Sequence, residues 1–199
     1  MKKLIIAVAL ATPLAAAAQV ENYIIDPFHT VPYFDIDHLG FATMRGRFDR
    51  ATGKFSIDRA AKTASVELEI PTATVNSGDT DKSGGRPRTR DEHLKNADFF
   101  NVQEFPTMTF KSTKVVFKGD EPASIEGNLT MLGVTRPVTL TLERWKCGSD
   151  IRTQGKRYQC GGNATGAFKR SEFGMKYGLP AAVGDEVKLW MSFYGFKQQ

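Results

Sequence analysis

The chain has few of the residues from which metal centres and redox sites are built. It contains two cysteines and three histidines in 199 residues. Twelve residues separate Cys147 from Cys160, whereas redox-active pairs and zinc sites usually use a tight Cys-x-x-Cys spacing. His29, His38 and His93 are 9 and 55 residues apart, which matches no standard ligand pattern. We therefore predict no metal site, and in an oxidising compartment we expect a structural disulfide between Cys147 and Cys160.

The sequence also lacks the motifs of the common enzyme classes. It has no Gly-x-Ser-x-Gly elbow, no glycine-rich phosphate loop and no cysteine placed as a nucleophile. Acidic residues beside histidines, such as Asp37 and His38 or Glu92 and His93, can act as acid and base pairs but often occur by chance. We predict that the protein is not an enzyme and needs no cofactor, and a small-molecule enzyme is the less favoured alternative.

Charge of one sign is not concentrated along the chain. The 27 Lys and Arg residues exceed the 22 Asp and Glu residues only slightly. The one basic run, Arg86-Pro87-Arg88-Thr89-Arg90, follows two glycines and is typical of a solvated loop. The sequence therefore gives no indication of nucleic-acid binding.

Long apolar runs are confined to the start of the chain. Lys2 and Lys3 precede an apolar stretch, and Ala16-Ala17-Ala18 resembles a cleavage site, so we predict that residues 1–18 are a cleaved signal peptide. The stretch is too short for a comfortable bilayer span, and no later run approaches one. We expect an exported, periplasmic protein with no stable membrane insertion and a single domain over residues 19–199.

The mature region has the alternation of apolar and polar residues that is typical of strands. Val66, Leu68 and Ile70 share one face, as do residues 138, 140 and 142, and the odd-numbered residues from 187 to 193. The parity changes between Phe110 and Val115, which indicates a bulge. The remaining predicted strands are 31–37, 43–48, 54–58, 107–117, 124–131 and 163–169. Turns are expected at 51–53, 118–120, 132–134 and in the cysteine segment.

Residues 76–106 interrupt this pattern with a long, polar, glycine-rich stretch. Within it, Thr89 and Glu92 have the spacing of a capping box, which predicts a short helical turn over residues 89–94. Phe99, Phe100 and Phe105 then concentrate aromatic side chains where the chain returns to the sheet. Loops of this length in compact domains are often functional.

Eight antiparallel strands can form a sandwich or a closed barrel, and periodicity alone does not separate the two. The order of motifs gives further information. They are YIIDP (23–27), FDIDHLG (34–40), RGRF (45–48), DEHL (91–94), FF (99–100), FPTMTFKS (105–112), GNLT (127–130), GVTRPV (133–138), RSEFGM (170–175) and DEV (185–187).

In this order the motifs resemble the YceI-like family of periplasmic lipid- and polyisoprenoid-binding proteins. The resemblance covers nearly the whole mature chain. It implies an all-β fold, an eight-stranded antiparallel lipocalin-like barrel, with an apolar cavity for an isoprenoid or other long-chain amphiphile. The residues themselves add the one long loop that carries a short helix. Homodimers are common in this family, so the resemblance also implies a homodimer here. The extended loop 79–90 and the cysteine pair depart from the plainest family pattern, and they leave the preferred head group of the ligand open.

A lipid tail gains about 0.8 kcal/mol for each methylene removed from water, so inward apolar side chains can supply affinity without directional contacts. Arginines and histidines at the mouth can pair with a polar head group. The predicted lipid-binding residues are Phe34, Ile36, His38, Phe41, Met44, Arg45, Arg90, His93, Met108, Phe110, Leu129, Met131, Arg170, Phe173, Met175 and Met191.

A third interpretation is a structural or stress-related protein whose barrel is packed solid. In that case the same phenylalanines and methionines fill the interior and no ligand is bound.

Overall fold

The computed structural model describes residues 20–199, so the predicted signal peptide lies outside the described residues. Eleven strands form one antiparallel sheet in the order β1-β4-β5-β7-β8-β9-β10-β11-β2-β3-β6, and β1 also pairs with β11. The strands are β1 (Glu21–Ile25), β2 (Val31–His38), β3 (Ala42–Phe48), β4 (Thr52–Asp58), β5 (Thr63–Pro71), β6 (Val75–Asn76), β7 (Thr107–Lys118), β8 (Glu121–Met131), β9 (Val134–Ser149), β10 (Tyr158–Lys169) and β11 (Val183–Lys197).

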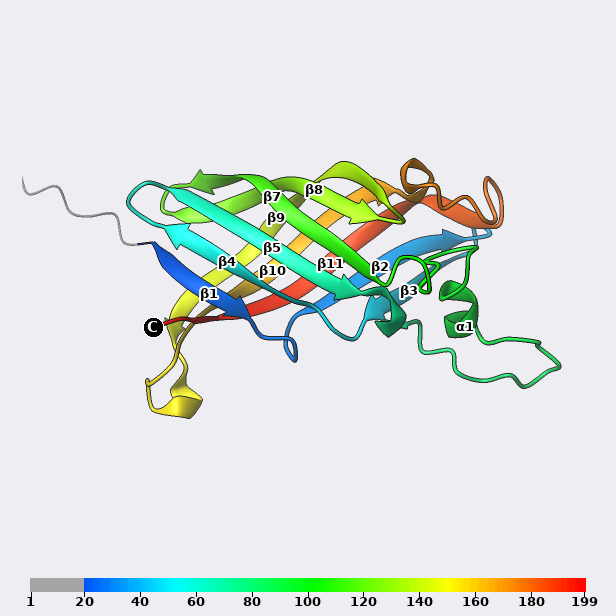
Figure 1. The fold of residues 1–199 in the computed structure, drawn as a ribbon, viewed down its shortest axis with the longest axis horizontal. Helices are drawn as coiled ribbons and strands as arrows, with labels where there is room; N and C mark the ends of the chain where they lie inside the picture. Colours follow the sequence, from blue (N-terminus) through cyan, green and yellow to red (C-terminus); the bar gives the residue numbers. More distant parts are fainter. Residues whose placement is uncertain (1–19) are drawn as a thin grey trace, which may run out of the picture.

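The sheet closes because β11 changes its partner along its length. Val187 to Ser192 pair with β2, whereas Gly195 to Lys197 pair with β1. The strands β1 and β2 thus follow each other along the same edge of β11. β4 pairs with β1, and β3 pairs with β2. The predicted eight-stranded antiparallel barrel is confirmed, and two of its eight positions are each formed by two shorter strands in succession (Figure 1).

Alternation places the core where the sequence predicts it. Leu68 and Ile70 of β5, Val138 and Leu140 of β9 and Phe193 of β11 are buried. The register of β7 against β8 shifts between Ser112 and Lys114, so the predicted bulge is also confirmed.

The long loop crosses one end of the barrel. It carries α1 (Arg90–Leu94), and the predicted capping box is present: Glu92 N donates to Thr89 Oγ1 at 3.0 Å, and Thr89 N donates to Glu92 Oε2 at 2.9 Å. We call this the α1 end; the β2–β3 turn and the segment before β11 lie there too (Figure 1). Within residues 20–199, no helix has both the length and the apolar character needed to cross a bilayer.

The predicted connection in the cysteine segment lies at the opposite end, which we call the disulfide end. Residues 150–157, with a 3-10 turn at Ile151–Thr153, join β9 to β10. Cys147 and Cys160 lie outside this connection, directly opposite each other in the two strands. The predicted disulfide is confirmed. Two further 3-10 turns are Thr72–Thr74 and Arg170–Phe173.

The predicted turn at 51–53 is wrong, because β4 already begins at Thr52. Gly53 lies inside β4 with φ +147°, and a Cβ atom there would collide with the carbonyl oxygen of Glu67 in β5. The glycine is required by the close approach of two backbones and not by a turn.

Candidate ligand-binding cavity

The barrel encloses a cavity of about 520 Å³ that reaches the α1 end. A volume of this size lies within the range of small-molecule sites. Its lining is almost entirely apolar and comes from strands on all sides of the barrel, with α1 residues Arg90, His93 and Leu94 at the mouth. The predicted residues that line it are Phe34, Ile36, His38, Met44, Arg45, Arg90, His93, Met108, Phe110, Leu129, Met131, Arg170, Met175 and Met191.

Two predicted residues do not line the cavity. Phe41 lies in the turn after β2 and is 93% exposed. Leu39 and Gly40 both have left-handed backbone angles, so the strand alternation ends before Phe41. Phe173 is buried in the 3-10 turn before β11 and packs its ring 5.2 Å from that of Phe168. It therefore supports a lining residue from behind.

The sequence-based set missed the aromatic side chains that the long loop and β3 contribute. Phe100 reaches the lining and packs its ring against Phe48 at 5.2 Å and Phe34 at 6.2 Å. Phe99 and Tyr177 border the mouth. The pair Phe99-Phe100 was visible in the sequence as an aromatic concentration, but it lies in a loop, where alternation does not indicate a direction.

His93 is enclosed by aromatic rings at the mouth. Its ring lies 4.9 Å from Phe99 and 4.8 Å from Tyr177. Its Nε2 atom is 2.7 Å from both Asp98 Oδ2 and Arg88 Nη2. Nε2 accepts from Arg88 in the tautomer that has no hydrogen on Nε2, and donates to Asp98 in the other, so the tautomer of His93 selects its partner.

The exposed arginines of the rim are already paired with carboxylates. Arg45 donates to both oxygens of Asp35 at 2.6 Å, and this contact lowers the pKa of Asp35. Arg90 Nη2 lies 3.6 Å from Asp79 Oδ2. Hydrogen bonds from Arg86 lower the pKa of Asp79, which therefore stays ionised. These ion pairs shape the rim and leave the cavity wall apolar.

Arg170 is the one predicted mouth residue that is fully buried. Its guanidinium donates to the carbonyl oxygens of Gly184 at 2.7 Å, Val183 at 2.7 Å and Met175 at 3.1 Å. Burial lowers its pKa, but an arginine remains charged at physiological pH. The contacts show that Arg170 fastens the segment between β10 and β11 over the α1 end.

Aromatic rings close the barrel interior towards the disulfide end. Trp145 packs its ring 6.0 Å from both Phe55 and Phe193, and Tyr23 stacks on Phe55 at 4.5 Å. The cavity lining includes none of these four residues. The cavity therefore has its mouth at the α1 end.

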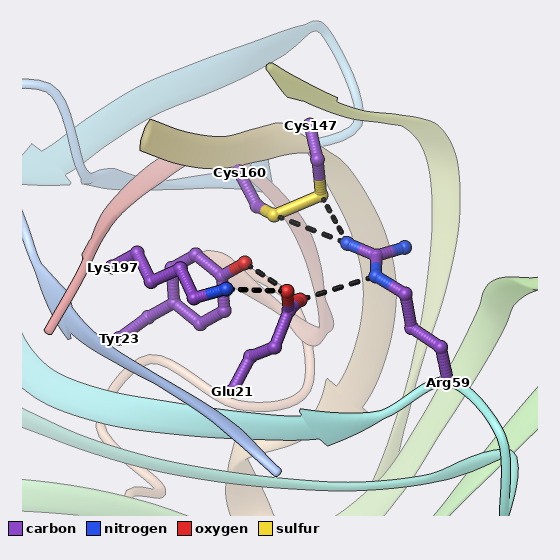
Figure 2. Close-up of a disulfide and its surroundings, with 6 residues drawn as sticks. All are labelled: Glu21, Tyr23, Arg59, Cys147, Cys160 and Lys197. Carbon is purple, nitrogen blue, oxygen red and sulfur yellow. Dashed lines mark hydrogen bonds and ion pairs between the residues drawn. A yellow bond between two sulfur atoms is a disulfide. The ribbon is translucent and has the colours of Figure 1, made fainter. Parts of the chain in front are cut away.

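A polar network lies beside the disulfide (Figure 2). Glu21 accepts hydrogen bonds from Lys197 at 2.6 Å, Tyr23 at 2.9 Å and Arg59 at 3.1 Å. Burial alone would raise the pKa of Glu21, but these three donors outweigh it and lower the pKa. Arg59 also contacts the sulfur atoms of the disulfide. The network connects β1, β9, β10, β11 and the turn after β4.

This arrangement offers shape and apolar area but few reactive groups. In residues 20–199 no three His, Cys, Asp or Glu side chains cluster as metal ligands would. The polar side chains at the mouth are held by one another or by the backbone, as described for His93, Arg45 and Arg170. Such a site is suited to holding an apolar chain.

The sequence matches a family model and curated relatives over most of its length. A model of the YceI-like domain matches residues 23–194. A UPF0312 protein of Pseudomonas aeruginosa is 37% identical over 202 residues, which cover all of both chains. A UPF0312 protein of Vibrio cholerae is 36% identical over 155 residues, 75% of this chain and 78% of the relative.

Solved structures share the fold at lower identity. BcnA of Burkholderia cenocepacia has a TM-score of 0.64 at 20% identity, covering 85% of this chain and 98% of its own. A polyisoprenoid-binding domain of Saccharophagus degradans has a TM-score of 0.61 at 14% identity, covering 88% and 98%. The YceI protein of Campylobacter jejuni has a TM-score of 0.61 at 23% identity, covering 82% and 90%.

Proposed function

The chain belongs to the YceI-like domain family, and from this premise we propose that it is a periplasmic protein that holds an isoprenoid or other long-chain amphiphile for transport or storage. The observation that carries the proposal is the 520 Å³ cavity with apolar walls. A chain that enters it leaves water along its whole length, and each buried methylene contributes about 0.8 kcal/mol.

The polar rim fits the other end of such a molecule. His93, Tyr177 and Arg90 border the mouth, where a head group can stay in contact with water. The polyisoprenoid-binding domain of Saccharophagus degradans, which shares the fold, supports the same class of ligand for this chain.

Export is supported by the signal-peptide pattern of residues 1–18 and by the disulfide, which persists in oxidising compartments. A homodimer is part of the proposal on the family resemblance alone.

The rival in which the barrel is packed solid is disfavoured by the same cavity. Phenylalanines and methionines line the interior without filling it, whereas ordinary protein cores contain few voids larger than a water molecule. The enzyme alternative rests on a pair at the cavity, Ser77 Oγ donating to Asp91 Oδ1 at 2.6 Å, but the same carboxylate oxygen also accepts from Ser77 N, as in a contact that orders the loop.

A pair of substitutions on β8 tests the proposal. Leu129 lines the cavity, so Leu129→Trp fills part of it and should reduce uptake of a long-chain prenol at least about tenfold. Asn128→Trp places the same side chain on the exposed face of the strand and should leave uptake unchanged. Binding of the prenol is measured by calorimetry, with circular dichroism to check the fold. Equal binding by both variants would place the ligand elsewhere and reject the cavity.

A further inference from the structure

A second, smaller cavity lies inside the barrel beyond the first. It has a volume of about 40 Å³ and is bordered by Ile25 and by three rings that close the disulfide end, Phe55, Trp145 and Phe193. Both cavities share four lining residues: Leu68, Leu140, Ala164 and Met191. These four side chains therefore form a floor between the main cavity and the space towards the disulfide end.

The floor is built from four strands, and its members differ in how freely they can move. Leu68, Leu140 and Ala164 are buried. Met191 is only partly buried although it points inward, because it faces open space. Ala164 lies directly opposite Met191 in the β10–β11 pairing, and its small side chain leaves room in front of the thioether. An unbranched methionine with three rotatable bonds can move into such room more easily than a leucine.

The volume of the main cavity limits the ligand. At about 30 Å³ for each heavy atom, the share of a water molecule in liquid, 520 Å³ accommodates roughly 17 heavy atoms. A longer tail has to end at the floor, leave the mouth or displace Met191 into the second cavity.

We propose that Met191 is the residue that determines ligand length: with Leu68 and Leu140 it forms the floor on which the end of a lipid tail rests, and its removal joins the two cavities. This inference rests on the proposed lipid-binding function and adds to it a length limit and the side chain that sets it. It follows that affinity should increase with chain length only until the tail reaches Met191.

The test uses two homologous series, linear prenols and straight-chain alcohols of about 10 to 24 carbons. With the unmodified mature protein, the affinity should increase about fourfold for each added methylene, equivalent to about 0.8 kcal/mol. The increase should stop at a break near the capacity of the main cavity. In Met191→Ala, which removes the three heavy atoms beyond Cβ, the break should move to chains about three carbons longer.

Two controls separate depth from volume. Met191→Leu retains a side chain of similar size and should leave the break where it is. Met108→Ala removes the same atoms as Met191→Ala from a residue that lines only the main cavity. It widens the cavity beside the chain without opening the floor, so it should weaken binding of all chains by a similar factor and leave the break in place. Affinities are measured by calorimetry on proteins stripped of lipid by solvent extraction and refolded.

The outcomes distinguish this inference from the proposed function. If no chain of either series binds the unmodified protein, the lipid-binding function itself is rejected. If chains bind and Met191→Ala has the same break as the unmodified protein, or if the unmodified protein has no break, Met191 is not the floor. Should Met191→Ala fail to fold, Met191→Val, whose side chain reaches two heavy atoms less far beyond Cβ, takes its place, and an unmoved break in that variant rejects Met191 as the floor.

Discussion

Tyr23 is fully buried at the disulfide end, where its hydroxyl donates to Glu21. Burial and this hydrogen bond to a carboxylate raise the pKa of Tyr23 to about 12 from the ordinary 10.0. The neutral phenol is therefore favoured in the folded state more than in the unfolded state.

The raised pKa predicts a loss of stability in alkali. The contribution of Tyr23 is fully present below pH 10 and is lost as the pH rises through about 12. Tyr23→Phe should be less stable than the unmodified protein at neutral pH, and the difference between the two should shrink across that interval. Urea unfolding at a series of pH values measures it, with Tyr158→Phe at a more exposed tyrosine as the control. A difference that does not change with pH would show that the ionisation of Tyr23 does not contribute.

Single residues also show where the sequence is informative about the site. Alternation within strands correctly directs Phe34, Met108 and Leu129 towards the cavity. It fails for Phe41, because two left-handed residues reverse the chain just before it. It also cannot show that Arg170 is bonded to three carbonyl groups of a later segment, because those contacts exist only after the chain has folded.

At the scale of elements, α1 is the part of the long loop that covers the mouth. It has only five residues, too few to be stable as an isolated helix, so its caps and its contacts hold it in place. Leu94 is buried under the loop, and His93 packs between Phe99 and Tyr177.

Loss of the capping box should therefore loosen the mouth without unfolding the barrel. Thr89→Ala removes the side-chain acceptor for Glu92 N, at a cost of about 1 kcal/mol. We expect dissociation of a bound prenol to become roughly fivefold faster, while the midpoint of barrel unfolding changes little. Stopped-flow displacement measures the rate. Thr139→Ala, at an exposed position of β9, serves as the control, and equal rates in both variants would argue against a role for α1 in retention.

Most elements were predictable because strand alternation and the capping box are local signals. The pairing of Cys147 with Cys160 was predicted, but their location inside two long strands was not, since residues 143–149 do not alternate clearly. The short strands β1 and β6 were missed as well. Each is defined by the neighbour it meets, β1 by β4 and β11 and β6 by β3, which sequence periodicity does not reveal.

At the scale of the whole molecule, the barrel has different ends. The α1 end holds the mouth with its polar rim, and the disulfide end is closed by Trp145, Phe55 and Phe193 and fastened by the Glu21 network (Figure 2). For the proposed lipid, this difference between the ends predicts one direction of entry, with the tail towards Met191 and the head group beside His93.

Whether the interior is open or packed is also a property of the whole molecule. The same inward phenylalanines and methionines fit both interpretations of the sequence, because periodicity specifies the face on which a side chain lies and not the diameter of the barrel. The folded barrel holds a cavity of about 520 Å³ between these side chains, and that volume depends on how all the strands close.

The proposed function requires that the cavity holds a lipid in the compartment where the protein works. The most direct measurement is native mass spectrometry of the protein purified from that compartment without detergent, before and after solvent extraction. We predict a stoichiometric added mass that extraction removes and that is identified as an isoprenoid or other long-chain amphiphile. A protein that is empty when isolated and takes up no isoprenoid supplied afterwards would contradict the claim and favour a structural role.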